Sequence, residues 1–181
     1  GVIEPVLARR IKLIGFDVDG TLTDGGLFIG AGIELKRFDI QDGLGMNLLK
    51  RAGLLTAVVT ARACEAARIR SEDMGVDDFV ISGGHKLPAF TAILEKRGVG
   101  WTEACFVGDD LPDIPIMHQV GLPIAVANAA AEVKEAAAHT TVARGGHGAV
   151  REAVEALLTA RGVWTKTVQA YLKERGDAPR R

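Results

Sequence analysis

Two aspartates near the start of the chain are the residues best suited to chemistry. The apolar run Ile11–Val18 predicts a buried strand, and Asp17 and Asp19 stand at its end, just before Gly20. Two carboxylates at the end of an apolar strand are costly unless a positive charge compensates them. Mg²⁺ prefers one or two carboxylates together with phosphate oxygens and water, so the pair indicates a magnesium site. Capping aspartates in a turn are the alternative that this segment alone leaves open.

A second acidic segment follows a later apolar run. Ala104–Val107 predicts a short strand, and Asp109 and Asp110 come after it, at the start of the predicted helix Leu111–Val120. Either carboxylate can complete a metal shell from a neighbouring strand. A helix-capping role explains one of the two aspartates but not the pair.

Two further polar residues follow other predicted strands. Thr60 comes after the run Leu54–Val59, and its hydroxyl can donate to a phosphate oxygen. Lys86 opens the predicted helix Lys86–Arg97, where the ammonium and the helix N-terminus both favour an anion. Each is unremarkable alone, as a turn threonine and a solvated lysine. Their order along the chain, each at a strand exit after the first acid pair, favours a common site.

This set of side chains predicts a phosphatase. A carboxylate such as Asp17 can attack phosphorus as a nucleophile and form an aspartyl-phosphate. Mg²⁺ screens the repulsion between that carboxylate and the phosphate, while Thr60 and Lys86 stabilise the phosphate oxygens. Asp19 can protonate the leaving alkoxide and then deprotonate the attacking water. We therefore expect a magnesium-dependent hydrolase of a small phosphorylated metabolite.

The elements that position these residues alternate between strand and helix. This pattern predicts an α/β fold with a doubly wound parallel sheet, and no linker or repeat divides the single domain expected for residues 1–181. The C-terminal segment, residues 164–181, reads as a helix followed by a polar tail. The further strands expected are Phe79–Ser82 and Ile124–Val126, and the further helices are Asp42–Arg51, Ala63–Met74, Ala131–Ala138, Gly148–Ala160 and Lys166–Arg175.

One segment interrupts the alternation. Residues 27–40 contain two extended runs around Gly30-Ala31-Gly32, which predicts a β-hairpin just after the first strand. The hairpin emerges at the carboxyl end of that strand, where parallel sheets bind ligands, so we expect a flap or an oligomer contact. A surface hairpin without a function is the alternative.

Composition excludes several classes of function. The 181 residues include 22 basic and 23 acidic side chains, a net charge of −1, which gives no electrostatic case for a nucleic acid or an anionic membrane as partner. The apolar runs are too short to span a bilayer. The first residues of the sequence do not form the long apolar segment that is typical of a signal peptide. Cys64 and Cys105 form no paired motif and are expected to be buried free thiols. We therefore expect a cytoplasmic protein.

The ordered motifs resemble the haloacid dehalogenase superfamily of phosphatases. The run Phe16–Thr23, Thr60, Lys86 and the run Gly108–Asp113 match its Asp-x-Asp-Gly, Ser/Thr, Lys and Gly-Asp-Asp-x-x-Asp elements in order. The resemblance implies that Asp17 is the nucleophile and Asp19 the general acid and base, and that Thr60 and Lys86 bind phosphate. It also implies that Asp17, the backbone carbonyl of Asp19, and Asp109 hold Mg²⁺, with Asp110 supporting them from behind.

A narrower resemblance covers nearly the whole chain. Asp17–Asp24, the hairpin, Phe38–Gly43 and Gly145–Glu152 are similar to the 3-deoxy-D-manno-octulosonate 8-phosphate (KDO 8-phosphate) phosphatase family, a capless branch of the superfamily that acts in lipopolysaccharide sugar synthesis. The resemblance implies a phosphorylated sugar acid as substrate, no inserted cap domain, and a homotetramer whose hairpins pack together.

Arg62 carries the expectation about the substrate. In the family, an arginine two positions after the Ser/Thr is associated with the octulosonate, and a guanidinium can hold a sugar-acid carboxylate through two parallel bonds. A related branch that acts on a nine-carbon sugar acid phosphate has glutamate there. Two positions depart from the usual family pattern: Ala61 stands where glycine is common, and His147 where arginine or glutamate is. An exposed arginine at a helix start is the alternative for Arg62.

Two other classes of protein have related patterns. Phospho-receiver modules of signalling pathways also place acids, a threonine and a lysine at strand ends, but their acid pair is adjacent and their phospho-accepting aspartate lies on a middle strand. Here the first strand carries Asp17 and Asp19, separated by one residue, and the adjacent pair comes late. An inactive scaffold of the same fold is the third reading, against which the intact motif set argues.

Overall fold

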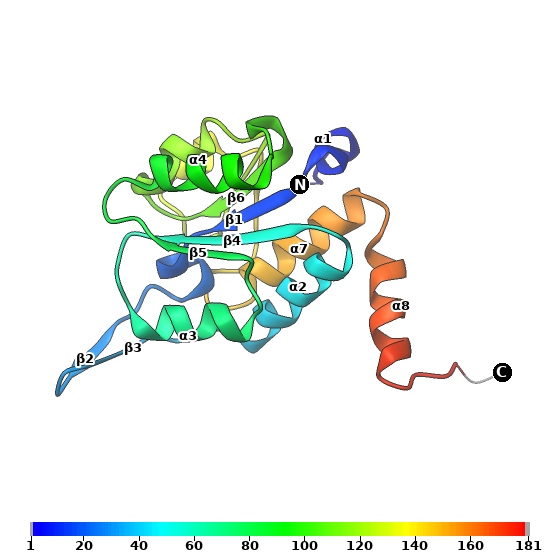
Figure 1. Ribbon diagram of the computed structural model, residues 1–181, viewed down its shortest axis with the longest axis horizontal. Helices are drawn as coiled ribbons and strands as arrows, with labels where there is room; N and C mark the ends of the chain where they lie inside the picture. Colours follow the sequence, from blue (N-terminus) through cyan, green and yellow to red (C-terminus); the bar gives the residue numbers. More distant parts are fainter. Residues whose placement is uncertain (1, 180–181) are drawn as a thin grey trace.

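A computed structural model describes residues 2–179 of the protein, and a six-stranded parallel sheet lies at its centre (Figure 1). Gly1, Arg180 and Arg181, which the expected domain and tail include, lie outside the described residues. In chain order the strands of the sheet are β1 Leu13–Phe16, β4 Leu55–Thr60, β5 Asp78–Ile81, β6 Ala104–Gly108, β7 Leu122–Ala125 and β8 His139–Thr140. Their order in the sheet is β5-β4-β1-β6-β7-β8, which confirms the predicted α/β class.

Helices cover both faces of the sheet. They are α1 Pro5–Arg10, α2 Ile40–Arg51, α3 Glu65–Asp73, α4 Lys86–Arg97, α5 Ile114–Met117, α6 Ala131–Ala136, α7 Ala149–Ala160 and α8 Trp164–Glu174. Figure 1 shows α2, α3 and α7 on one face and α4 on the other, where α5 and α6 continue its layer. The connection into β4 runs through α2 and the connection into β6 runs through α4, so the two connections lie on opposite faces of the sheet. The carboxyl end of β1 is the topological switch point at which such sheets bind ligands.

Strand β1 is buried on both faces, as expected for the centre of a parallel sheet. It pairs with β4 on one side and β6 on the other. Gly15 brings β1 close to two aromatic rings, because a Cβ at this position would lie only 2.6 Å from Phe90 and 2.7 Å from Phe106. Those rings pack edge to face with centroids 5.3 Å apart. This packing fixes the strand just before Asp17.

The largest error of the sequence prediction concerns the helix expected over Leu111–Val120. The chain instead forms a 3₁₀ turn, Leu111–Asp113, followed by the short helix α5. Pro112 and Pro115 lack a backbone N–H and so favour helix starts over a continuous helix. Helix α1 and the two-residue strand β8 were not predicted, because both are too short to show a periodic pattern.

The predicted hairpin is present and projects from the body of the protein (Figure 1). Its strands are β2 Phe28–Gly30 and β3 Ile33–Leu35, which pair antiparallel across a turn at Ala31 and Gly32. Both turn residues have positive φ, 47° and 76°. The hairpin and α2 occupy the segment between β1 and β4, and α3 and β5 occupy the segment between β4 and α4. Neither segment of the described chain holds an inserted domain, as the capless pattern predicts.

The C-terminal helix α8 lies away from the hairpin, on α2 and α7 (Figure 1). Arg51 of α2 pairs with Glu174 of α8 at 2.7 Å and lies over the ring of Tyr171. None of the helices within residues 2–179 has both the length and the apolar character required to cross a membrane.

Candidate active site

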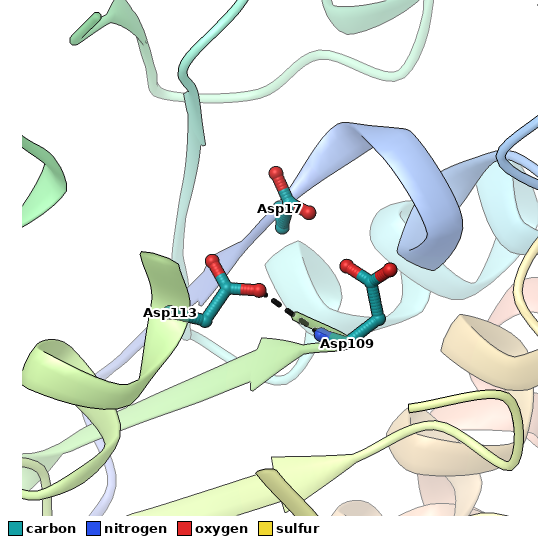
Figure 2. A group of neighbouring side chains, drawn as sticks. All are labelled: Asp17, Asp109 and Asp113. Atoms are coloured by element: carbon teal, nitrogen blue, oxygen red, sulfur yellow. Dashed lines mark hydrogen bonds between the residues drawn. The ribbon is translucent and has the colours of Figure 1, made fainter. Parts of the chain in front are cut away.

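Three carboxylates meet at the carboxyl ends of β1 and β6. Asp17 follows β1, Asp109 follows β6, and Asp113 ends the 3₁₀ turn (Figure 2). One oxygen from each of the three lies within 4.8 Å of the oxygens from the other two. Asp17 is 5% exposed and Asp113 fully buried. Such a group of buried anions requires a compensating positive charge.

Lys86 supplies part of that charge. Its Nζ atom lies 2.6 Å from Asp17 Oδ1 and 2.7 Å from Asp113 Oδ1, at the N-terminus of α4. Burial by itself lowers the pKa of the Lys86 ammonium, but the two carboxylates outweigh it, so the pKa lies above its ordinary value. Lys86 is therefore a charged lysine that joins the nucleophile candidate to the acidic turn after β6.

One ammonium does not balance three carboxylates. Burial, followed by the neighbouring Asp17 carboxylate, raises the pKa of Asp109 and the pKa of Asp113 above the usual range of aspartate. A divalent cation among the three oxygens would relieve this repulsion. An all-oxygen set of carboxylates suits a hard ion such as Mg²⁺, so these residues fit the expected metal.

The backbone after β1 turns sharply to hold Asp17 beside Asp109. Gly20 has φ = 84°, and a Cβ there would overlap the Asp109 carboxylate. Thr21 donates a hydrogen bond to Asp109 Oδ1 at 3.3 Å. The carbonyl oxygen of Gly20 accepts from Asn128 Nδ2 at 2.9 Å, which ties the turn to the chain after β7. Position 20 therefore requires glycine, both because its φ is positive and because a side chain there would collide with the Asp109 carboxylate.

Asp113 is the residue of this group that the sequence analysis did not single out. Its Oδ2 accepts hydrogen bonds from the N–H groups of Asp109, at 3.0 Å, and Asp110, at 3.3 Å. Figure 2 draws the first of these bonds. Asp110, which we expected to support the metal shell, is exposed, and its side chain accepts from the N–H of Leu111 at 2.8 Å as a helix cap. The structure therefore brings Asp113, and not Asp110, into the carboxylate group.

Asp19 lies outside the group of three. Its carboxylate is 36% exposed and pairs with Lys36, which follows the hairpin strand β3. The Lys36 Nζ atom lies 2.6 Å from Asp19 Oδ1. No role for this lysine was predicted from the sequence, although its alternation with the apolar residues of β3 places it on the inner face of the hairpin.

Thr60 and Arg62 stand at the carboxyl end of β4, beside β1. Thr60 is fully buried, and its hydroxyl is 3.4 Å from the carbonyl oxygen of Arg62. The Arg62 side chain is half exposed and forms an ion pair with Glu34 of β3, so it is joined to the hairpin and not to the carboxylates. The hydrogen bond from Arg62 is the main reason that the pKa of Glu34 is lowered. Ala61 is unstrained, since Ala31 is the single non-glycine residue with positive φ in the described chain.

Comparisons with known proteins agree with this geometry. A family model described as haloacid dehalogenase-like hydrolase matches residues 61–152. The 3-deoxy-D-manno-octulosonate 8-phosphate phosphatase of Escherichia coli K12 is 38% identical over 156 residues, which is 86% of this chain and 83% of that protein. The enzyme of the same name from Haemophilus influenzae is 36% identical over 168 residues, 91% of this chain and 93% of that protein. The chain belongs to the KDO 8-phosphate phosphatase family.

Solved structures of this family have the same fold. The phosphatase of Moraxella catarrhalis, in complex with a magnesium ion, a phosphate ion and KDO, matches with a TM-score of 0.89 and 32% identity, over 92% of this chain and 97% of that one. The cobalt-bound enzyme of Haemophilus influenzae matches with a TM-score of 0.87 and 35% identity, over 92% and 99% of the two chains. The resemblance to the family, first carried by four motifs, thus extends over most of the chain.

Proposed function

We propose that this protein is a Mg²⁺-dependent phosphatase that hydrolyses 3-deoxy-D-manno-octulosonate 8-phosphate to KDO and phosphate, a step of lipopolysaccharide sugar synthesis. The observation that carries the proposal is the buried group of Asp17, Asp109 and Asp113 with Lys86. It lies at the switch point of the sheet, in a chain that is 38% identical to an enzyme of that name. The binding of KDO, phosphate and magnesium by the Moraxella catarrhalis relative supports the same substrate and metal.

In this mechanism Asp17 is the nucleophile. One of its carboxylate oxygens attacks phosphorus, the bond to the sugar oxygen breaks, and an aspartyl-phosphate forms on Asp17. Lys86, which contacts Asp17 Oδ1, holds the nucleophile in place and offsets negative charge around the phosphate. Thr60 donates its hydroxyl to a phosphate oxygen from the end of β4. Mg²⁺, held by Asp17, Asp109 and the carbonyl oxygen of Asp19, supplies Lewis-acid stabilisation of the phosphate oxygens.

Asp19 transfers the protons. As a carboxylic acid it protonates the sugar oxygen as that oxygen leaves. As a carboxylate it then accepts a proton from the water that attacks the aspartyl-phosphate, which releases inorganic phosphate and restores Asp17. Asp113 supports the acidic turn: it holds the N–H groups of Asp109 and Asp110 and shares Lys86 with Asp17. This supporting role is the one that the sequence analysis had given to Asp110.

Arg62 is proposed to select the sugar acid. Its guanidinium is half exposed at the end of β4, next to the strand that carries Asp17, and can pair with a substrate carboxylate. In the described structure this position is taken by the carboxylate of Glu34. Glu34 therefore stands in for an acidic ligand, in the sense that it presents the same chemical group to Arg62.

The hairpin is proposed to pack against other copies of the chain in a homotetramer. Phe28, Ile29, Ile33 and Leu35 are each more than half exposed, an unusual concentration of apolar side chains on an element this small. A two-stranded hairpin is also marginal unless it packs on something. Solution mass measured by light scattering tests the assembly, and a monomer at micromolar concentration would contradict it.

We also propose the cytoplasm as the location of the enzyme. Cys64 and Cys105 are both free and buried, as expected of a protein from a reducing compartment. No partner other than the small substrate and further copies of the chain is required by the proposal.

A phosphate-release assay tests the function. Purified protein with Mg²⁺ is given KDO 8-phosphate, a nine-carbon sugar acid phosphate, hexose phosphates and nucleotides, and we expect the octulosonate to have the highest kcat/KM. Asp17→Asn should abolish release from every substrate, because the amide is a poor nucleophile. The matched control Asp73→Asn removes a carboxylate from an exposed position at the end of α3. Turnover by Asp17→Asn would refute the mechanism, and a clear preference for the nine-carbon acid or a hexose phosphate would refute the substrate.

A further inference from the structure

The second strand of the hairpin has two different faces. Ile33 and Leu35 are 60% and 55% exposed. Glu34 and Lys36 alternate with them and turn toward the body of the protein, as the two-residue period of an extended chain requires. None of the Lys36 side chain is exposed. A buried ammonium on a short projecting element is costly without a partner, so its contact is informative.

That partner is Asp19. Lys36 Nζ lies 2.6 Å from Asp19 Oδ1, and within residues 2–179 this is the one hydrogen bond that either side chain makes. The contact holds one oxygen of the Asp19 carboxylate and leaves Oδ2 without a protein partner. Asp19 is also 36% exposed, so its free oxygen is accessible to a ligand.

We propose that Lys36 is a positioning residue for the proton transfers of Asp19. By holding Oδ1, Lys36 fixes the rotamer of the carboxyl group so that Oδ2 is the oxygen that exchanges a proton with the leaving group. The inference rests on the proposed function, since it assigns Lys36 a role in that same reaction. It gives the hairpin a part in the chemistry of its own site, beyond any packing between copies.

A role of Lys36 in proton transfer can be distinguished from a purely structural role by changing the leaving group of the substrate. When Asp17 attacks phosphorus, the bond from phosphorus to the sugar oxygen breaks and the proton of Asp19 passes to that oxygen, which leaves as an alcohol. A p-nitrophenyl group leaves as a stable anion and needs no proton at this step. The value of kcat/KM depends on the steps up to and including the first irreversible one, which here is the departure of the leaving group. For an aryl phosphate, kcat/KM is therefore insensitive to the general acid.

The experiment compares the two leaving groups in Lys36→Met and Lys36→Arg. General acid catalysis contributes about 10²- to 10⁴-fold, so we expect Lys36→Met to lower kcat/KM for KDO 8-phosphate at least tenfold. For p-nitrophenyl phosphate the value should change by less than about threefold, and Lys36→Arg, which keeps a cationic donor, should recover most of the loss. Equal losses on both substrates, or no loss on either, would overturn the proposal.

A second measurement tests whether Lys36 acts through Asp19. In the Asp19→Asn background, the further change Lys36→Met should alter kcat/KM for the sugar phosphate by less than about twofold, because coupled residues are not additive. Independent, multiplying effects would overturn the proposal. Lys96→Met is the control for the loss of one paired lysine, since Lys96 lies 2.7 Å from Asp78 at the far end of α4, although its side chain is exposed.

Failure of the inference can be told apart from failure of the proposed function. If the wild-type protein releases no phosphate from the sugar acid phosphate, the function is wrong. If it does so and the ratio of the two kcat/KM values is unchanged in Lys36→Met, the function stands and the role of Lys36 is wrong. The activity on the aryl phosphate also shows that each variant is folded, which melting temperature and solution mass check independently.

Discussion

Asp42 makes the stability of this protein depend on pH. It lies in the first turn of α2 and is 1% exposed. Its Oδ1 accepts from the N–H of Arg151 at 2.9 Å, whereas Oδ2 has no hydrogen-bond partner within residues 2–179. Burial is the main reason that the pKa of Asp42 is raised to about 7, well above the ordinary range of an aspartate. The folded protein therefore holds a proton over a range of pH in which the unfolded chain has lost it.

The sign and size of the effect follow from this difference. Where the folded state binds more protons, the free energy of unfolding falls as pH rises. The contribution of Asp42 is complete below about pH 4 and is lost as pH rises through about 7. Between pH 5 and pH 8 the loss is roughly 3 kcal/mol, from about two units at about 1.4 kcal/mol each, because Asp42 in the folded state ionises only as pH passes about 7. In a chain of this size, that corresponds to a melting temperature lower by roughly 6–12 °C.

Asp42→Asn tests this calculation. Asparagine keeps an oxygen for the Arg151 N–H and cannot ionise, so the variant should gain about 3 kcal/mol relative to the wild type between pH 5 and pH 8. The free energy of unfolding is measured by urea titration with circular dichroism, in saturating Mg²⁺ so that the metal-binding carboxylates stay ionised. Asp73→Asn controls for the loss of one negative charge. Parallel pH profiles for wild type and Asp42→Asn would show that Asp42 does not set the pH dependence of stability.

Three further predictions concern the site itself. Asp113→Asn should weaken Mg²⁺ binding roughly tenfold or more, seen in the Mg²⁺ dependence of phosphate release, because the residue orients the Asp109 backbone and Lys86; an unchanged Mg²⁺ titration would contradict this. Glu34→Gln should lower KM a few-fold for substrates with a carboxylate but not for hexose phosphates, because it releases Arg62 from an exposed ion pair that competes with the substrate. Mg²⁺ at a hundred times its Kd should stabilise the fold by about 2.7 kcal/mol; equal melting temperatures with and without chelator would refute a metal site.

The sequence predicts the parts of this site that depend on strand order. Asp17, Thr60 and Asp109 each stand at the carboxyl end of an apolar run, and parallel strands bring those ends to one edge of a sheet. Lys86 was predicted at the start of its helix, and α4 begins there. These placements follow from local hydrophobic pattern and from the right-handed crossovers that parallel strands require.

Residues placed by non-local contacts were not predicted. Asp113 falls inside a segment that reads as one amphipathic helix, and only the 3₁₀ turn at Pro112 directs its side chain back toward the end of β6. Lys36 and Glu34 are polar residues in a hairpin whose docking is set by partners at Asp19 and Arg62. No local pattern encodes which carboxylate a lysine on a projecting hairpin will reach.

The position of the hairpin offers a chain without a cap domain a way to control the leaving-group side of the proposed site. The sheet places the proposed nucleophile Asp17, the carboxylate of Asp109 and the hydroxyl of Thr60 at strand ends, and Lys86 joins them from the start of α4. The side chains that approach Asp19 and Arg62 come from β3 and the residue after it. Because extended chain alternates its faces, the same residues that turn Glu34 and Lys36 inward must turn Ile33 and Leu35 outward. The proposed assembly through the outer face and the proposed proton transfer at the inner face are therefore expected to be coupled, so a variant that weakens the proposed tetramer should lower kcat/KM for the sugar acid phosphate more than for an aryl phosphate.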